Sequence, residues 1–458
     1  MPPDPDPLLA SLPTTLPPVE RMSRMPGGFA AVGTTAGIKA SGRPDFALIV
    51  ATGGPVPAAA GFTPNRFAAA PGRLSRANLQ ATGGTPATCG YAAAVIATSG
   101  SANAATGPGG DADQAAIGQA VADAIGTTPD HVLHLSTGVI GTRLPVDKVV
   151  ATIKRVTDEG LEYTDLALGQ AAVSLRTTDS TTKMASVTTK LPTADGGTVA
   201  VAVTGIAKGV GMIHPRMATM LSIVLTDAAA SPLTLRTLLR GAAAVTWDQL
   251  SVDGDTSTND TVFALASGGA GAISADEDDG VRAALGAAIE AVARDLARQQ
   301  ARDGEGATAL ITCQVTGAAD DADARAVARA VISSSLVKAA VHGKDANWGR
   351  IAGAAGNALL AEAGVLEAAG LSAGEAAARA SQPAAVDPAL MRIAIAGHLA
   401  YDGAAGGPTG IDKAAARDAM DVDEVVIRVD LGLGHGTGEA FGCPLTEAYV
   451  KENSEYTT

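Results

Sequence analysis

The chain has 458 residues, enough to bury a sizeable core, and this length suggests two or three folding units. It carries 33 basic and 47 acidic residues, a net charge of −14. That balance argues against nucleic acid or an anionic membrane surface as partner, because both require clustered Lys and Arg. No apolar run is long enough to cross a bilayer. The three cysteines are far apart and in no metal-ligand spacing, which predicts a reduced, cytoplasmic compartment.

The first 25 residues are rich in Pro, Asp and Ser. They lack the basic segment followed by an apolar one that marks a secretion signal. We therefore expect a disordered N-terminal arm over residues 1–25.

Strands and helices are predicted to alternate along the rest of the chain. Short runs with β-branched residues predict strands over 46–51, 92–98, 132–136, 198–206, 220–226, 309–316 and 424–431. Apolar residues repeating every three or four positions predict helices over 112–125, after Ser231-Pro232, and from about 281 to Asp303. The Ala- and Gly-rich stretch 352–405 is expected to be helix and loop without chemistry. Interleaving of this kind favours layered α/β packing.

The segment 208–221 is the most informative. A loop broken by two glycines ends at Ala218-Thr219, directly before a predicted strand. A threonine hydroxyl at such a junction can attack the preceding carbonyl, and the freed α-amine, with a pKa of about 7.7–8.0, can then act as its base. A nearby cation, Lys208, would lower the pKa of that amine. The pattern predicts self-cleavage at Ala218-Thr219; an ordinary loop-to-strand junction is the alternative.

Two further segments could support this chemistry. Thr137 and Gly138 follow a predicted strand, where a hydroxyl and a backbone N–H can point at an oxyanion, each worth about 3 kcal/mol. Glu305 lies between glycines at a helix–strand junction and could receive a cationic substrate group. Each pattern also fits an ordinary turn.

Two other loops are polar or glycine-rich without a matching motif. Residues 252–261 lack the glycine placement and terminal glutamate of a calcium loop, so we expect an internally hydrogen-bonded turn. Residues 432–438 lack the spacing of a phosphate loop, which favours a glycine hairpin. The six histidines form no ligand set, and no metal is predicted.

Taken together, these segments resemble the ornithine acetyltransferase family, also called glutamate N-acetyltransferase. The matching segments are 36–39, 64–66, 136–141, 176–179, 208–221, 252–261, 302–308, 336–350, 442–451 and 453–458. The resemblance implies an α/β fold, a multilayered sandwich of sheets and helices similar to N-terminal-nucleophile hydrolases, with a smaller C-terminal α/β part.

The resemblance also implies autoproteolysis at Ala218-Thr219. The products would be an α chain, 26–218, and a β chain, 219–458, which stay together and assemble into an α2β2 heterotetramer or larger. By matching position, Thr219 is the nucleophile and acetyl carrier, Thr137 and Gly138 are the oxyanion donors, and Lys208 is catalytic. The family's substrate-binding positions match Thr177, Lys208, Thr219, Glu305, Asn453 and Thr458.

The implied reaction moves an acetyl group from N2-acetyl-L-ornithine to L-glutamate by a ping-pong mechanism, without metal or organic cofactor. A related N-terminal-threonine amidohydrolase or aminopeptidase is the alternative. An acetyltransferase with another acceptor, in secondary metabolism, is a further one. It rests on departures from the family pattern, such as Ser101 and Ala105 where asparagine and cysteine are common.

Overall fold

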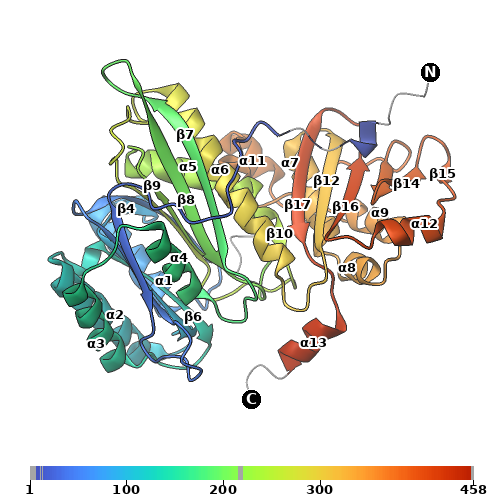
Figure 1. Cartoon of the computed structure of the whole chain (residues 1–458). Coiled ribbons are helices and arrows are strands. Elements are labelled where there is room, and N and C mark those ends of the chain that lie inside the picture. Colours follow the sequence, from blue (N-terminus) through green and yellow to red (C-terminus); the bar gives the residue numbers. More distant parts are fainter. Residues whose placement is uncertain (1–6, 11, 13, 215–219, 455–458) are drawn as a thin grey trace.

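The computed structural model describes residues 7–10, 12, 14–214 and 220–454. It contains two units that lie side by side, a layered N-terminal unit and a C-terminal α/β unit (Figure 1). Ala218, Thr219 and Thr458 lie outside the described residues.

Two sheets packed face to face form the centre of the N-terminal unit. The four-stranded sheet has the order β1 (Phe29–Thr34), β2 (Phe46–Ala51), β5 (Ala94–Ser101), β6 (Val132–Val139). The six-stranded sheet has the order β4 (Cys89–Ala92), β3 (Val56–Phe62), β11 (Thr261–Ala266), β9 (Leu221–Thr226), β8 (Thr198–Lys208), β7 (Lys183–Pro192). One apolar core joins the facing sides of both sheets.

Helices cover the outer faces of both sheets. The helices of this unit are α1 (Ala70–Gly83), α2 (Gly107–Ile125), α3 (Val146–Glu159), α4 (Asp165–Leu175), α5 (Pro232–Val245) and α6 (Asp279–Arg302). Apolar residues of α2 and α3 pack on the four-stranded sheet, and those of α5 and α6 pack on the six-stranded sheet. Helix α4 contributes to the core between the sheets. The result is the multilayered α/β sandwich that the sequence predicted.

Strand β9, which begins two residues after Thr219, lies at the centre of the six-stranded sheet between β8 and β11. Its side chains alternate between two apolar environments. Leu221 and Ile223 face the core between the sheets, whereas Val224 faces α5 and α6. A strand buried on both faces is apolar throughout. This explains why the sequence after position 219 is mostly apolar, with Ser222 as the one polar residue between Met220 and Leu225.

The C-terminal unit is built on a mixed seven-stranded sheet. Its order is β10 (Leu250–Ser251), β17 (Gly436–Gly442), β12 (Leu310–Ala318), β16 (Glu424–Asp430), β13 (Arg392–Ile395), β14 (His398–Asp402), β15 (Gly407–Pro408). The helices that follow β12 are α7 (Asp321–Ser333), α8 (Ser335–His342), α9 (Trp348–Gly356), α10 (Ala363–Ala368), α11 (Ala373–Arg379), α12 (Lys413–Ala419) and α13 (Glu447–Ser454). Helix α7 packs on β12 and β17, and α6 lies next to the same strands.

The structure confirms the predicted strands and helices to within a few residues at most ends and corrects two expectations. Helix α5 begins as predicted, with the Ser231 hydroxyl accepting a hydrogen bond from the Thr234 N–H. The stretch 352–405 contains strands β13 and β14 in addition to helices. Its Ala and Gly residues are common to both kinds of element and hide the strand pattern. Residues 432–438 do not form a hairpin, because β16 and β17 lie on opposite sides of β12.

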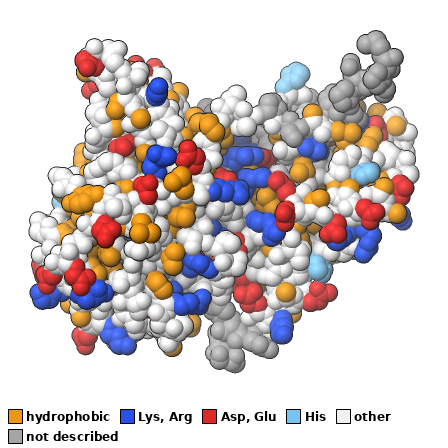
Figure 2. All heavy atoms as spheres, viewed as in Figure 1, with side chains coloured by type: hydrophobic (Ala, Val, Ile, Leu, Met, Phe, Trp, Pro, Cys, Tyr) orange, Lys and Arg blue, Asp and Glu red, His pale blue; other side chains and the backbone are white. Residues whose placement is uncertain are grey.

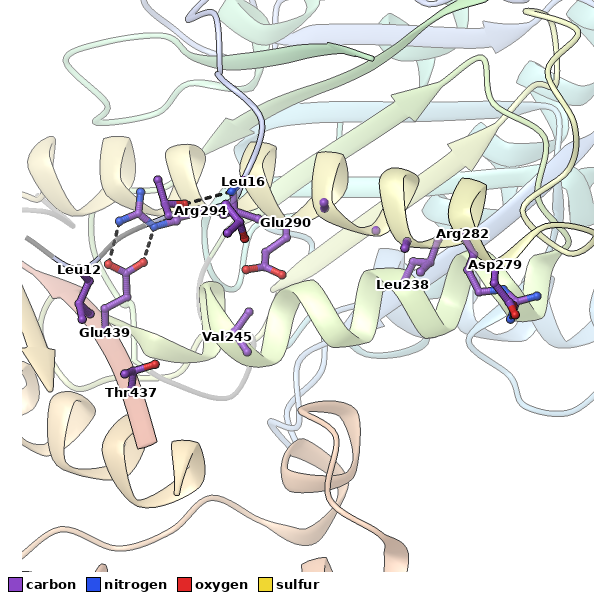
Figure 3. A pocket seen from close by; sticks show the side chains of 16 residues that line it. Leu12, Leu16, Leu238, Val245, Asp279, Arg282, Glu290, Arg294, Thr437 and Glu439 are labelled. Carbon is purple, nitrogen blue, oxygen red and sulfur yellow. Dashed lines mark hydrogen bonds and ion pairs between the residues drawn. The ribbon is translucent and has the colours of Figure 1, made fainter. Parts of the chain in front are cut away.

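Part of the expected N-terminal arm packs on the N-terminal unit. The Glu20 N–H donates to the Ser186 carbonyl at 2.9 Å, and Arg21 pairs with Asp295 of α6 at 3.0 Å. Leu12 and Leu16 line a cavity of about 700 Å³ beside α5 and α6, near the Arg294–Glu439 ion pair (Figure 3). The described part of the arm therefore contacts the N-terminal unit, and the disorder expected over residues 1–25 stays a prediction.

Acidic and basic side chains are intermixed over the face shown in Figure 2. This face has no wide basic surface of the kind that nucleic acid requires. Among the described residues, no helix is both long enough and apolar enough to span a bilayer.

Candidate active site

A cavity of about 270 Å³ lies where the two central sheets and the C-terminal helix α13 approach one another. Its walls come from the end of β6, the loop before β7, the end of β8, the loop before β11, the loop after α6, and α13. The lining residues are Ala102, Thr137, Gly138, Val139, Ile140, Thr177, Thr178, Lys208, Gly211, Met212, Ser257, Thr258, Asn259, Glu305 and Asn453. Segments from before and after position 218 therefore meet in one cavity.

One part of the cavity wall is formed by Thr137 and Gly138, where β6 runs parallel to β5. Gly138 has a φ of +131°, and a Cβ at this position would lie 2.3 Å from the carbonyl carbon of Gly100. Only glycine fits so close an approach of two backbones. The sequence at 138 thus fixes how this peptide faces the cavity.

Another part of the cavity wall contains Glu305, which follows α6. Its carboxylate accepts hydrogen bonds from the Thr178 hydroxyl at 3.0 Å and from the Asn453 amide at 2.9 Å. Its backbone N–H donates to the Val210 carbonyl at 2.8 Å. A Cβ on Gly211 would lie 2.4 Å from a Glu305 oxygen, so the glycine makes room for the acid. An anionic group held in this way can receive a cation.

Lys208, the last residue of β8, is buried beside the same cavity. Burial lowers the pKa of its ammonium group, and the nearby carboxylate of Asp179 opposes that effect. The Lys208 Nζ lies 3.9 Å from Asp179 Oδ2. The Lys208 carbonyl accepts a hydrogen bond from Gln300 at 2.9 Å, which anchors the end of the strand to α6.

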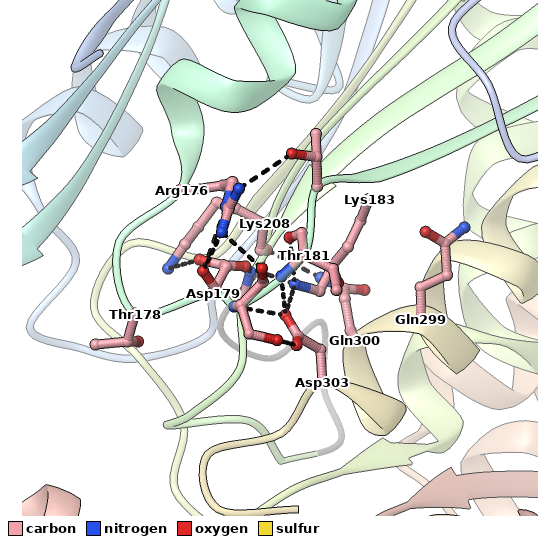
Figure 4. Close-up of polar contacts among 12 residues, drawn as sticks. Arg176, Thr178, Asp179, Thr181, Lys183, Lys208, Gln299, Gln300 and Asp303 are labelled. Atoms are coloured by element: carbon pink, nitrogen blue, oxygen red, sulfur yellow. Dashed lines mark hydrogen bonds and ion pairs between the residues drawn. The ribbon is translucent and has the colours of Figure 1, made fainter. Parts of the chain in front are cut away.

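Asp179 belongs to a buried ion-pair network that includes Lys208 of the cavity wall (Figure 4). The Nζ of fully buried Lys183 lies 2.7 Å from Asp179 Oδ1 and 2.6 Å from Asp303 Oδ2. Asp179 also accepts hydrogen bonds from the N–H groups of Thr177 and Gly209. Burial alone would raise the pKa of Asp179, but Lys208, Lys183 and the Gly209 N–H hold it well below its usual value. The network thus supports two sides of the cavity at once.

Known proteins resemble this chain over nearly its whole length. The family model described as the ArgJ family matches residues 30–458. A relative from Thermosynechococcus vestitus, named arginine biosynthesis bifunctional protein ArgJ, is 43% identical over 94% of this chain and 96% of its own length. The Thermus thermophilus relative of the same name is 40% identical over 95% and 99%. The chain belongs to the ArgJ family.

One solved structure is also similar to this chain in sequence. The ornithine acetyltransferase of Mycobacterium tuberculosis, crystallised with ornithine, is 39% identical, covering 43% of this chain and 97% of that chain with a TM-score of 0.37. Family membership confirms the resemblance inferred from the sequence motifs. As a member of the ArgJ family, the chain is an enzyme.

The cavity brings together the site residues that the sequence predicted, as far as the structure describes them. These residues are Thr137, Gly138, Thr177, Lys208, Glu305 and Asn453. Ala218 and Thr219, the predicted cleavage pair, and the terminal Thr458 lie outside the described residues. The individual roles of all these residues remain predictions.

Sequence reasoning missed several members of the cavity wall in this ArgJ-family chain. Residues 252–261 were expected to form an internally bonded turn, and the Asp255 N–H does donate to Asp253. The same segment, however, brings Ser257, Thr258 and Asn259 into the cavity. Thr178 also lines the cavity, but the sequence prediction named only its neighbour Thr177. The detectable signal is the density of hydroxyl and amide side chains, which does not reveal which of them face inward. Among the described residues, no group of three or more His, Cys, Asp or Glu could hold a metal.

Proposed function

We propose that the chain is a self-cleaving glutamate N-acetyltransferase. It would move the acetyl group of N2-acetyl-L-ornithine to L-glutamate through an ester on Thr219. The observation that carries the proposal is the cavity, in which Thr137, Gly138 and Lys208 from before the predicted cut meet Glu305 and Asn453 from after it.

In the first half-reaction, the Thr219 hydroxyl attacks the acetyl carbonyl and gives its proton to the free α-amine of the same residue. The Thr137 hydroxyl and the Gly138 N–H donate to the oxyanion that forms. The C–N bond then breaks, the leaving amine takes the proton, and ornithine departs. In the second half-reaction, the amine of glutamate attacks the acetyl ester, and Thr219 regains its proton.

The charges of the cavity match amino-acid substrates. The carboxylate of Glu305 suits the cationic end of the acetyl donor, and an ammonium group at Lys208 suits a substrate carboxylate. Thr178 and Asn453 hold Glu305 from two sides, so its position does not depend on the substrate. Opposite charges at separate points favour a zwitterionic ligand over an uncharged amide.

The sheet topology supports the proposal that the two pieces stay together after cleavage. Strands β9 and β11, from the later piece, lie between β3 and β8 of the earlier piece. Separation would break two complete strand pairings. We propose assembly into α2β2 or larger complexes, and action in the cytoplasm, the latter supported by three buried free cysteines.

Intact-mass spectrometry tests the proposal directly. The purified protein should show the masses of two fragments, one ending at Ala218 and one beginning at Thr219. N-acetylornithine should add one acetyl group to the later fragment. Glutamate should remove that group and yield N-acetylglutamate. Thr219→Val should abolish both cleavage and the adduct, whereas turnover retained in this variant would refute the proposal.

The same assay separates the competing functions. A hydrolase would release ornithine at a rate that glutamate does not change, and acetate would accumulate. The curated relatives are named bifunctional, so acetyl-CoA should be tested as a second acetyl donor. Removal of the last six residues should abolish transfer if Asn453 and Thr458 contact substrate.

A further inference from the structure

The buried side chain of Asn259 joins strand β6, which carries both predicted oxyanion donors, to the end of its neighbour β5. Its Nδ2 donates to the Ser136 carbonyl at 2.8 Å and to the Ala102 carbonyl at 2.7 Å. Ser136 belongs to β6, and Ala102 directly follows β5. Asn259 is 8% exposed and lines the cavity.

The bond to Ser136 acts on the peptide that leads into Thr137. The Ser136 carbonyl and the Thr137 N–H belong to one planar peptide unit, so holding the oxygen fixes that plane. The next peptide carries the Gly138 N–H. The Ala102 N–H donates to the Val139 carbonyl at 3.0 Å, which ties the other side of the same turn. One amide group thus fixes both backbones around the pair Thr137-Gly138.

The orientation of the Asn259 amide is determined by its neighbours. Its Oδ1 accepts a hydrogen bond from the Thr258 hydroxyl at 2.6 Å, while both partners of Nδ2 are carbonyls that can only accept. The backbone N–H of Asn259 donates to the Ser257 hydroxyl at 3.1 Å. Loss of the amide would leave two carbonyls without this donor, which is costly inside a protein.

We infer that Asn259 is a positioning residue for the oxyanion site, acting from the later piece of the chain on Thr137 and Gly138 of the earlier one. The inference rests on the proposed acetyl transfer. It adds a residue that does not touch the reacting atoms and is supplied from across the cleavage point.

Asn78 provides a matched control. Its Nδ2 also donates to two backbone carbonyls, those of Pro129 and Val132, and it is 4% exposed. Val132 begins the same strand β6, at the end away from Thr137. Asn259→Ala and Asn78→Ala therefore each remove two hydrogen bonds from a side-chain amide to backbone carbonyls, at opposite ends of β6.

The test compares the kcat and KM of both variants, measured per cleaved enzyme, with thermal unfolding as a check on folding. Asn259→Ala should lower kcat by about 100-fold, with KM for N-acetylornithine within about 3-fold, because a small misplacement of reacting groups costs about that much. Asn259→Asp should be equally impaired, since a carboxylate cannot donate to the two carbonyls. Asn78→Ala should keep kcat within about 3-fold.

A double-mutant cycle with Thr137→Ala isolates the mechanism. If Asn259 acts through the oxyanion donors, its removal should cost about 10-fold less in kcat when Thr137 is already alanine. Full additivity, equal loss of kcat in Asn78→Ala, or near-normal kcat in Asn259→Asp would each overturn the inference. Failure of the proposed function is distinguishable, because it would appear as turnover retained in Thr219→Val.

Discussion

Two parts of the cavity wall are built by different physical means: a packed part, Thr137 and Gly138, and a charged part, Lys208 and Glu305. In the packed part, position is set by backbone packing, hydrogen bonds to carbonyls and one glycine that no other residue can replace. In the charged part, buried charges that neutralise one another set the position of Lys208, and hydrogen bonds from Thr178 and Asn453 set the position of Glu305. The geometry of the packed part depends on close contact between backbones. The geometry of the charged part depends on the protonation states of its side chains.

Damage to the two parts should therefore affect function and stability differently. A group held by packing can be displaced while the fold survives, so damage there should appear mainly in kcat. A buried cation shared by two carboxylates cannot be removed without leaving uncompensated charge, so damage there should appear first in stability.

Loss of the Lys183 ammonium group should have the strongest effect on stability. In Lys183→Met, the buried carboxylates of Asp179 and Asp303 lose their shared cation, and we expect the free energy of unfolding to fall by about 3–5 kcal/mol. Urea denaturation measures the change. As a control, Lys154→Met removes an exposed pair with Asp158 and should cost less than about 0.5 kcal/mol. Equal losses in the two variants would mean that burial of the network is irrelevant.

In the packed part of the wall, Gly138→Ala should lower kcat. The added Cβ meets the Gly100 backbone at 2.3 Å, so the peptide must rotate away from the oxyanion. We expect kcat to fall by about 10²–10³-fold, the usual cost of losing one such donor. Gly141 also has a positive φ, +85°, but no atom within 4 Å of its Cβ position. Gly141→Ala should therefore keep kcat, and a matching loss would show that the close contact is not the cause.

Local patterns predicted much of this molecule from sequence. Strand β9, helix α5 and helix α6 were predictable because a period of two or three to four residues and a capping residue are all local signals. The predicted site residues also lie in one cavity, as far as they are described. The missed strands β13 and β14 lie in a segment whose small residues carry no period.

Long-range contacts explain the remaining gaps. Asn259 contacts Ala102 and Ser136, more than 100 positions earlier, and no spacing within 252–261 indicates that reach. Lys183 was likewise not distinguished from a surface lysine, because its two acidic partners become adjacent only in the folded chain. Residues 432–438 were misread as a hairpin since only the sheet order places β12 between the strands they connect.

A smaller effect is expected at Glu305. Glu305→Gln removes the charge but keeps the shape, and should raise KM for N-acetylornithine about 10-fold while kcat changes little. Thr178→Val removes one hydrogen bond to that carboxylate and should raise the same KM only about 3-fold. Steady-state kinetics with varied acetyl donor measures both. If kcat falls and KM stays constant, Glu305 acts on the reacting atoms. The contrast between the packed and the charged part of the wall would then be wrong.

The smallest effect is a pH dependence of stability that comes from Lys39, beside the charged part of the wall. Lys39 donates to the Arg176 carbonyl at 2.6 Å, in the loop that leads into Thr177, and burial lowers the pKa of Lys39 to about 8 despite nearby Asp45. An unfolded lysine has a pKa of about 10.4. Between these values the unfolded chain holds a proton that the folded chain has released, so this group makes stability rise with pH.

Lys39→Met removes that contribution, which isolates it from all other titrating groups. The difference in unfolding free energy between the native protein and Lys39→Met should therefore shift in favour of the native protein from pH 8 to pH 10. Because the side chain is only half-buried and solvent screens it, we expect a shift on the order of 1 kcal/mol. Denaturant unfolding at several pH values measures it. If the difference in unfolding free energy stays constant, the Lys39 proton is not released on folding. The charged part of the wall would then be less sensitive to protonation than its ion pairs suggest.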